Sequence, residues 1–257
     1  MGILNVTPDS FSDGGQFGDI DRAIVQAKSM VAQGASIIDV GGESTRPGAN
    51  PVSASEEQDR VLPVIEALAR ECDIAVSIDT YRAETATLAL NAGAHIINDV
   101  WGFQKDPDIA GVAAANKAGV CSMHTGRERT PNPDVIADQL GFLTNSLKIL
   151  DAAGVQKASI VLDPGFGFAK DPSENAQLLA RLDELHPLGF PLLIGTSRKR
   201  FIGHYTGREA HERDIGTAAT SVVARMKGGS VFRVHDVRAN ADALAIADAI
   251  ISNQRVN

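Results

Sequence analysis

The sequence predicts a single-domain α/β protein with the fold of a (β/α)8, or TIM, barrel. Three observations lead to this prediction: short apolar runs alternate with longer amphipathic stretches, there are eight of each, and most of the apolar runs end in a polar residue. Strands that are buried on both faces of a parallel sheet have such continuous apolar runs. Eight alternating units suit a barrel, and a doubly wound open sheet is the alternative.

The apolar runs are the expected strands. They cover residues 2–6, 36–40, 75–79, 95–99, 120–124, 159–163, 191–196 and 231–236. Between them, apolar residues recur at helical spacing at 20–33, from Ser53 onward, and at 81–92, 107–118, 134–153, 173–186, 212–227 and 238–252. The second helix opens with Ser53 and Glu56, the spacing of a capping box. No charge-rich linker or tandem repeat interrupts the alternation, so residues 1–257 are expected to form one domain.

Composition argues against several classes of function. The chain is 44% apolar and carries a formal net charge of −8 without a basic run, which argues against a nucleic-acid or membrane-surface partner. No apolar run reaches the ~18 residues of a membrane helix, and no signal peptide is apparent. The two cysteines, Cys72 and Cys121, lack metal-type spacing and indicate a cytoplasmic protein with reduced thiols. No cluster of histidines and carboxylates suggests a tightly held transition metal.

The ends of the predicted strands carry the polar residues that point to a site. They are Asn5, Asp39, Asp79, Asn98, Asp99, His124, Asp163, Thr196, Arg233 and His235. The carboxyl ends of the strands form the active face of an α/β barrel, so these side chains are expected to meet at one mouth. A single Asp or Asn at such a position is also a common helix cap. Capping does not account for Arg233, His235 or Lys199, so the set as a whole predicts a functional site.

Three loops on the same face add to this site. They comprise residues 5–18, 41–53 and 195–203. The first two are rich in glycine and exceed the usual length of a strand-to-helix connection, which makes them candidate lids. The third places Ser197, Arg198 and Lys199 on the expected first turn of a helix. Cations there oppose the helix dipole, whereas a helix start attracts anions, so we expect a bound anion.

Seven motifs occur in order along the chain at barrel spacing. They are LNVTPDSFSDGG, DVGGESTRPGA, SIDT, INDV, LDPGFGF, GTSRK and RVHD, and they run from about Gly2 to Asp236. Together they resemble the dihydropteroate synthase family of pterin-binding barrels. The resemblance implies a transferase of folate biosynthesis that condenses 6-hydroxymethyl-7,8-dihydropterin pyrophosphate with 4-aminobenzoate, releasing pyrophosphate and 7,8-dihydropteroate. It also implies a Mg²⁺ cofactor, a homodimer and competition by sulfonamides.

The resemblance further implies a role for each matching position. It puts the pterin ring at Asp79, Asn98, Asp163 and Lys199, and the pyrophosphate at Asn5, Arg233 and His235, with Asn5 also matching the Mg²⁺ ligand. Thr45, Arg46 and Pro47 match the second loop, Phe11 and Asp13 match the first, and Phe168 and Ser197 match the pocket for 4-aminobenzoate. Six residues are expected to take part in catalysis: Asn5, Arg46, Asp79, Lys199, Arg233 and His235.

The sequence departs from the family pattern in two places. Thr125 stands where many members have a second Met after Met-His, which affects one apolar contact to the pterin. The segment that members usually carry before the first strand is not in this sequence, which affects the lower end of the barrel. Neither departure falls on the expected pocket residues.

The expected chemistry is the displacement of pyrophosphate from the pterin CH₂ group by the aryl amine. An aryl amine is a weak nucleophile, so Mg²⁺, Arg233, His235 and Arg46 are expected to stabilise the leaving group. Three rival functions remain open at this point: a Schiff-base aldolase that uses Lys199, a pterin-binding methyltransferase domain with a corrinoid partner, and a non-catalytic pterin-binding module. A basic pyrophosphate site at Arg233 and His235 favours the synthase over the methyltransferase.

Overall fold

The computed structural model describes residues 1–6, 15–43 and 52–254. Eight parallel strands form one sheet in the order of the sequence: β1 (Gly2–Asn5), β2 (Ile37–Gly41), β3 (Ala75–Asp79), β4 (Ile96–Asp99), β5 (Gly119–Met123), β6 (Ile160–Asp163), β7 (Leu192–Ile194) and β8 (Gly229–Phe232). The chain just after β8 returns to β1, because the Val234 carbonyl accepts from Ile3 N–H and Val234 N–H donates to the Met1 carbonyl, both at 3.0 Å. The sheet therefore closes, which confirms the barrel and excludes the open sheet.

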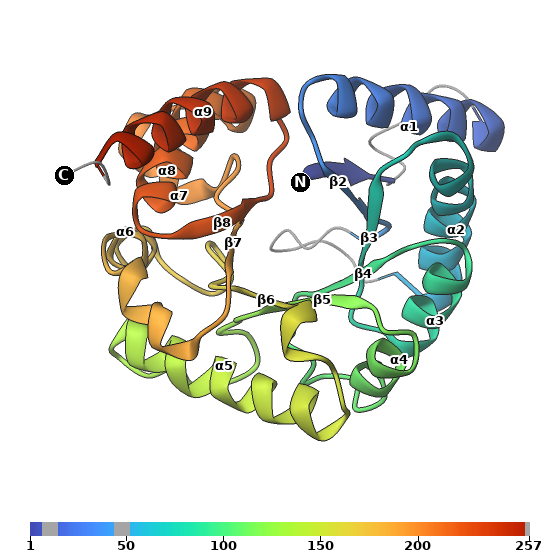
Figure 1. Cartoon of the computed structure of the whole chain (residues 1–257), viewed down its shortest axis with the longest axis horizontal. Coiled ribbons are helices and arrows are strands. Elements are labelled where there is room, and N and C mark those ends of the chain that lie inside the picture. The colour runs from blue at the N-terminus through green and yellow to red at the C-terminus, as the bar shows by residue number, and fades with distance from the viewer. Residues whose placement is uncertain (7–14, 44–51, 255–257) are drawn as a thin grey trace.

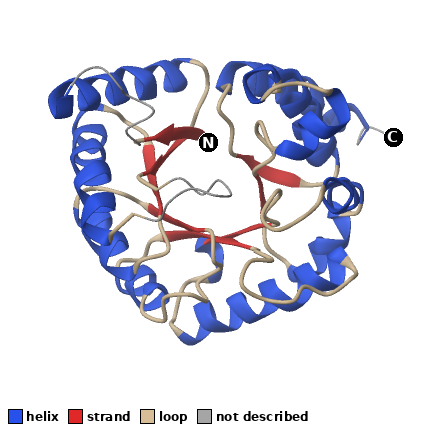
Figure 2. Cartoon of the chain, turned by 180° about the vertical axis from the view of Figure 1, so that it is seen from behind, coloured by secondary structure: helices blue, strands red, loops and turns tan. Residues whose placement is uncertain are grey.

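Helices surround the ring of strands in both views (Figures 1 and 2). They are α1 (Gly15–Ala32), α2 (Ala54–Glu71), α3 (Ala83–Asn91), α4 (Ile109–Ala115), α5 (Val135–Ala152), α6 (Pro172–Ala180), α7 (Arg200–Thr206), α8 (Asp214–Met226) and α9 (Val237–Gln254). The expected capping box opens α2, since Glu56 N–H donates to Ser53 Oγ and Ser53 N–H donates to Glu56 Oε2. Where one helix was predicted over 173–186, α6 ends at Ala180 and a 3-10 helix follows over Leu182–Leu188.

The connection after β7 differs most from the prediction. Two helices, α7 and α8, follow β7, in place of a helix expected to begin at Ser197 and a second one expected over 212–227. Helix α7 begins at Arg200 and Lys199 is its N-cap, so Ser197, Arg198 and Lys199 precede the helix and do not form its first turn. Arg198 has a φ of 55°, a left-handed backbone conformation that does not occur within a right-handed α-helix. The predicted placement of these three residues on the first turn of a helix is therefore wrong, and the bound anion expected near them stays a prediction.

Strand β8 also differs from the prediction. It covers Gly229–Phe232, whereas residues 231–236 were expected. Pairing with β7 continues one residue beyond it, because Arg233 N–H donates to the Ile194 carbonyl at 3.0 Å. Arg233 and His235 therefore lie just past the strand, at the same end of the barrel as the other strand ends.

Apolar side chains from strands and helices form one large buried core. Among those fully excluded from solvent are Leu4, Ile38, Ile78, Ile97 and Leu162 from the strands and Val61, Ile65 and Leu68 from α2. Both cysteines are free thiols, as predicted, and Cys121 is buried. Within the described part of the chain, no helix combines the length and apolarity needed to cross a membrane.

Candidate active site

A row of polar residues crosses the carboxyl ends of the first four strands. The parallel register places Asn5 beside Gly41, Gly41 beside Asp79, and Asp79 beside Asn98. Side chains in one register row point to the same face of a sheet, so these residues face the barrel interior together. Gly41 leaves space in the row, since a Cβ there would lie 3.7 Å from Asp79 Oδ2 and 3.8 Å from Asn5 Oδ1. The register thus brings residues of four motifs to one place.

Arg233 connects this row to a carboxylate that the sequence analysis left without a role. Its Nε donates to Asp39 Oδ2 at 2.6 Å, and its Nη2 donates to Asp79 Oδ2 at 2.7 Å. Asn98 Nδ2 donates to the same Asp39 oxygen at 3.1 Å. Asp39 is fully buried, and its other oxygen, Oδ1, has no hydrogen-bond partner among the described residues. The sequence shows only that Asp39 lies near the end of a strand, a position that it shares with residues to which a role was assigned.

The charges of this group depend on one another. Burial by itself would lower the pKa of Arg233, but Asp39 and Asp79 together raise it above its ordinary value, so the guanidinium stays charged. Burial raises the pKa of Asp79 to about 7, against the opposing effect of Arg233 and with a further increase from Asp39. One cation thus pairs with two buried carboxylates, and the pKa of the Asp79 carboxyl is raised toward neutral pH.

Asp163 and Lys199 face the mouth from β6 and from the loop after β7. Asp163 is buried, and its Oδ1 accepts the Gly165 N–H at 2.7 Å. Burial raises its pKa, while the Gly165 N–H and Lys199 oppose that change. Burial and Arg233 lower the pKa of Lys199 to about 8, against Asp163 and Asp79. The Lys199 ammonium lies 4.3 Å from the centre of the Phe168 ring, a cation–π contact.

Ser197 and His235 form a separate pair beside these groups. Ser197 Oγ accepts the His235 N–H at 3.1 Å and lies 2.9 Å from His235 Nδ1. The Ser197 hydroxyl still has its own proton to donate to Nδ1, and in that arrangement the proton of a neutral imidazole lies on Nε2. Burial, together with Arg198 and Arg233, lowers the pKa of His235 to about 4. The imidazole is therefore neutral, and it offers an N–H donor where the sequence analysis expected charge neutralisation.

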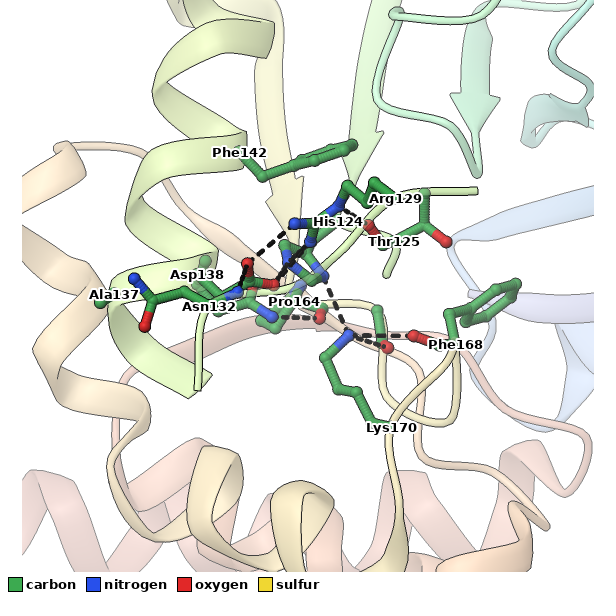
Figure 3. Close-up of polar contacts among 12 residues, drawn as sticks. His124, Thr125, Arg129, Asn132, Ala137, Asp138, Phe142, Pro164, Phe168 and Lys170 are labelled. Atoms are coloured by element: carbon green, nitrogen blue, oxygen red, sulfur yellow. Dashed lines mark hydrogen bonds and ion pairs between the residues drawn. The ribbon is translucent and has the colours of Figure 1, made fainter. Parts of the chain in front are cut away.

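Several strand-end residues have structural contacts away from the mouth. Asp99 accepts the N–H groups of Trp101 and Phe103, both at 2.7 Å, so it shapes a turn. Thr196 Oγ1 lies 2.8 Å from Thr220 Oγ1 on α8. Arg198 makes a bidentate pair with Asp214, at 2.8 and 2.7 Å, which accounts for its charge without a bound anion. His124 binds Asp138 and Lys170 behind the site (Figure 3).

The two candidate lids are only partly within the described residues. Phe11, Asp13, Thr45, Arg46 and Pro47 lie outside them, so their predicted roles stay predictions. Among the described residues, no group of three or more histidine, cysteine or carboxylate side chains could hold a metal ion. The site that is described thus combines Asn5 and the strand-end acids with Arg233 and Lys199.

Comparison with known proteins finds close relatives over the whole chain. Residues 1–235 match the family model of pterin binding enzymes. The chain is 48% identical to the dihydropteroate synthase of Bacillus subtilis over 257 residues, which are 100% of this chain and 90% of that protein. It is 49% identical to the dihydropteroate synthase of Clostridium beijerinckii, with coverage of 98% and 93%.

Solved structures agree with this similarity. The dihydropteroate synthase of Clostridium difficile, determined in the presence of pteroic acid, superposes with a TM-score of 0.95 at 50% identity and covers 97% of this chain and 95% of its own. The enzyme of Xanthomonas albilineans with 4-aminobenzoic acid superposes with a TM-score of 0.94 at 42% identity, with coverage of 100% and 93%. A Yersinia pestis enzyme bound to a sulfonamide drug gives a TM-score of 0.91 at 44% identity, with coverage of 98% and 93%.

Proposed function

We infer the function of the site from one premise: the chain belongs to the family of pterin-binding enzymes, and its relatives are dihydropteroate synthases. It is accordingly a transferase that joins a pterin pyrophosphate to 4-aminobenzoate. The observation that carries this assignment within the structure is the register row from Asn5 to Asn98, which faces Asp163, Lys199 and Arg233 across one mouth. The roles of individual residues, the metal and the order of bond changes are proposals.

We place the pterin ring between the row and β6. A 2-amino-4-oxopyrimidine presents adjacent N–H donors along one edge, and the Asp163 carboxylate accepts such a pair. Asn98 supplies an amide at the floor of the site, where it is held by Asp39. Lys199, next to Asp163, supplies a donor for a carbonyl oxygen or ring nitrogen. Burial of these groups makes each unpaired donor or acceptor costly, which favours a ligand that pairs all of them.

We place the pyrophosphate near Asn5, Arg233 and His235. The hydrogen bonds of Arg233 to Asp39 and Asp79 use Nε and Nη2, so Nη1 has no partner among the described residues and is available to a phosphate oxygen. His235 offers Nε2–H, because Nδ1 is held by Ser197. Asp39 and Asp79 fix the orientation of the Arg233 guanidinium. It therefore needs little reorganisation when negative charge develops on the departing pyrophosphate. Arg46, outside the described residues, is expected to add a second guanidinium.

The donor set fits Mg²⁺ better than a transition metal. Mg²⁺ keeps several waters and is usually held by one or two protein oxygens together with substrate phosphates. The side-chain oxygens of Asn5 and Asp79 both border the space above Gly41, which matches such a sparse set of hard ligands. When bound, the ion would neutralise part of the charge of the departing pyrophosphate. We propose that Asn5 contributes its Oδ1 to this ion.

We place 4-aminobenzoate beside Phe168, whose ring also packs against the cation of Arg127, at 4.7 Å. An aryl carboxylate can lie along such a ring with its charge near a cation. Phe11 and Pro47, outside the described residues, would complete the apolar walls. Ser197 was assigned to the same pocket, and its bond to His235 connects that pocket to the pyrophosphate side. Sulfonamides, which resemble the aryl amine, would occupy this pocket.

A homodimer is also part of the proposal. Large apolar side chains are exposed on two neighbouring helices: Ile215, Val223 and Met226 on α8 and Ile246 and Ile250 on α9. Ile215 and Val223 recur at helical spacing and lie on one face. Clustered exposed residues of this size are typical of a protein interface. We propose that a second copy of the chain covers this face.

One assay tests the function. The chain is incubated with the pterin pyrophosphate, 4-aminobenzoate and Mg²⁺, and the release of pyrophosphate is compared with the appearance of dihydropteroate. Equal amounts of the two products support the condensation. Repeated turnover that releases many equivalents of pyrophosphate without 4-aminobenzoate would indicate a hydrolase, and absence of both products would contradict the assignment.

A further inference from the structure

A second cluster of polar side chains lies behind the proposed pterin site, between the ends of β5 and β6 (Figure 3). We call it the His124 cluster, and it consists of His124, Arg129, Asp138 and Lys170. His124 follows β5, Asp138 lies in the first turn of α5, and Lys170 ends the loop after β6. The side chains of His124 and Asp138 are 1% and 8% exposed. None of these ionisable groups is among the proposed substrate contacts, although they are costly to bury.

Both ring nitrogens of His124 have polar neighbours within hydrogen-bonding distance. Lys170 Nζ lies 2.9 Å from His124 Nδ1, 2.8 Å from the Gly165 carbonyl oxygen and 3.4 Å from the Phe168 carbonyl oxygen. Burial lowers the pKa of Lys170 to about 7, and its protonated form has three protons, one for each of these acceptors. His124 Nδ1 is then an acceptor, and His124 Nε2 lies 2.8 Å from Asp138 Oδ2 and 2.9 Å from Arg129 Nη2.

Asp138 fixes the outer end of the cluster. Arg129 donates to both of its oxygens, and the Asn132 N–H donates to Oδ1 at 2.7 Å. Burial alone would raise the pKa of Asp138, but the bonds from Arg129, His124 and Asn132 hold it well below its usual range. The carboxylate therefore stays ionised and holds the His124 ring in one orientation. The ring also packs edge-on against Phe142, 4.9 Å between centres.

The cluster holds one particular segment, residues 163–168, which we call the DPGFGF loop. Lys170 binds the Gly165 and Phe168 carbonyls, and the His124 N–H donates to the Asp163 carbonyl at 2.8 Å. Gly165 has a φ of 65°, and a Cβ there would overlap the His124 carbonyl oxygen. The loop thus lies directly on the His124 backbone, and the lysine that binds it is itself held by the His124 ring.

Both ends of the DPGFGF loop carry proposed substrate contacts. Asp163 begins it, with its Oδ1 bound to the Gly165 N–H inside the loop. Phe168 ends it, with its ring 4.3 Å from Lys199 Nζ. A shift of the Gly165 peptide or of the Phe168 carbonyl would therefore change the direction of a pterin acceptor and of an aromatic wall together.

We propose that Lys170 and His124, supported by Asp138, are positioning residues that set the affinity for pterin through Asp163 and for the aryl amine through Phe168. This inference rests on the proposed roles of Asp163 and Phe168. It assigns no contact with substrate to the His124 cluster. We expect pyrophosphate affinity to be independent of the cluster. Asn5 lies on β1 and Arg233 and His235 lie just past β8, where Asp39 and Ser197 hold them.

The first test replaces Lys170 by methionine, which keeps the length of the side chain and removes all three hydrogen bonds. Calorimetry measures the dissociation constants of 6-hydroxymethylpterin and of inorganic pyrophosphate, and steady-state kinetics measures kcat and the KM for 4-aminobenzoate. We expect the pterin dissociation constant and the KM each to rise about tenfold or more, with pyrophosphate affinity unchanged within about twofold. Unchanged pterin affinity, or a parallel loss of pyrophosphate affinity, would overturn the proposal.

A matched pair at His124 separates the lysine link from the aspartate link. The amide oxygen of His124→Asn lies near the Nδ1 position and can accept from Lys170, whereas the amide nitrogen of His124→Gln lies near the Nε2 position and can bind Asp138. Both changes remove the ring and its contact with Phe142. We expect His124→Asn to bind pterin several-fold more tightly than His124→Gln. Equal affinities would contradict a lysine-mediated role, and this comparison decides the question if Lys170→Met does not fold.

The control for a merely structural effect is Ser221→Ala. Ser221 is 1% exposed and its Oγ donates to Asn240 Oδ1 at 2.8 Å, on α8 and away from the loop. This change should lower the midpoint of unfolding with no change in pterin affinity. Turnover by the unaltered chain tests the proposed function separately, so a failure of the function and a failure of this inference give different results.

Discussion

Asp79 Oδ2 lies 2.7 Å from Nη2 of Arg233, while Nε of the same guanidinium lies 2.6 Å from Asp39. The cation at the mouth is therefore bound to two carboxylates before any substrate arrives. Asp39 is fully buried and Asp79 and Arg233 are largely so. Removing one member of such a group leaves a buried charge without compensation, which costs more than the intact group contributes to stability.

The first prediction concerns this charge balance. Arg233→Met should lower the free energy of unfolding by about 3 kcal/mol at neutral pH, because Asp39 and Asp79 are left facing each other. Adding Asp39→Asn should restore more than half of the loss. Denaturant titration measures both. The matched control is Arg181→Met, whose solvent-exposed pairs with Asp134 and Glu184 should contribute little to stability. A double variant no more stable than Arg233→Met would show that charge compensation is not the cause.

The second prediction concerns the contact between Asp163 and the pterin. Asp163→Ala should weaken binding of 6-hydroxymethylpterin by one to two orders of magnitude, since unpaired buried donors of the pterin cost about 1–3 kcal/mol. Calorimetry provides the dissociation constant. Asp171→Asn, at the other end of the same connection, preserves the cap of α6 and should bind pterin normally. If both variants bind equally well, Asp163 does not contact the pterin.

The third prediction concerns how the stability of the folded chain depends on pH. Burial, with a further contribution from Lys170, lowers the pKa of His124 from 6.5 to about 4, against the effect of Asp138. The unfolded chain therefore binds more protons at this histidine between pH 4 and 6.5, and stability must rise with pH over that range and be fully present above it. A proton on His124 Nδ1 would face the side-chain nitrogen of Lys170, which lies 2.9 Å away.

Other groups titrate in the same range with the opposite sign. Burial raises the pKa of Asp79 and of Asp99 to about 7, so their contributions fall as pH rises. The informative quantity is consequently the difference between the unaltered chain and His124→Asn, in which these contributions cancel. We expect that difference, measured by denaturant titration from pH 4 to 7, to grow with pH. A difference independent of pH would mean that His124 is not held neutral.

The fourth prediction is that turnover depends on a divalent metal ion. Turnover should stop in excess chelator and return with Mg²⁺, and Asn5→Ala should raise the Mg²⁺ concentration needed for half-maximal rate about tenfold. Pterin binding without pyrophosphate should be unaffected by either change, which is the internal control. Full turnover in the presence of chelator would rule out the proposed metal.

The fold and much of the site follow from the sequence because a parallel barrel ties position to function. Apolar runs locate the strands, and the residue that ends a run lies at the mouth, so Asp79, Asn98 and Asp163 were identified without any contact information. The parts that were missed depend on side-chain partners. Asp39 is indistinguishable by pattern from Asp99, yet one binds Arg233 and the other binds a turn. Arg198 likewise could not be assigned to Asp214 from spacing.

The last prediction is that pyrophosphate leaves largely before the amine bonds to the pterin CH₂ group. The polar groups of the mouth favour departure: Arg233 has a free terminal nitrogen among the described residues, and His235 offers a neutral N–H. The carboxylates are engaged elsewhere, since Asp79 binds Arg233 and Asp163 binds the Gly165 N–H. With no base assigned to the amine, a route that asks little of the nucleophile fits these residues, and the electron-rich pterin can carry the transient positive charge.

Ring-fluorinated 4-aminobenzoates of decreasing amine basicity distinguish the two orders of events. Single-turnover measurements at saturating amine are required, because release of product can limit the steady-state rate. Early departure of pyrophosphate predicts a chemical step that is almost independent of basicity, together with a strong dependence on Arg233, so that Arg233→Lys slows the chemical step by about the same factor for every amine in the series. If the rate falls steeply as basicity decreases, bond formation leads, and a base must then act on the amine, with Asp79 the first candidate because its pKa is raised to about 7.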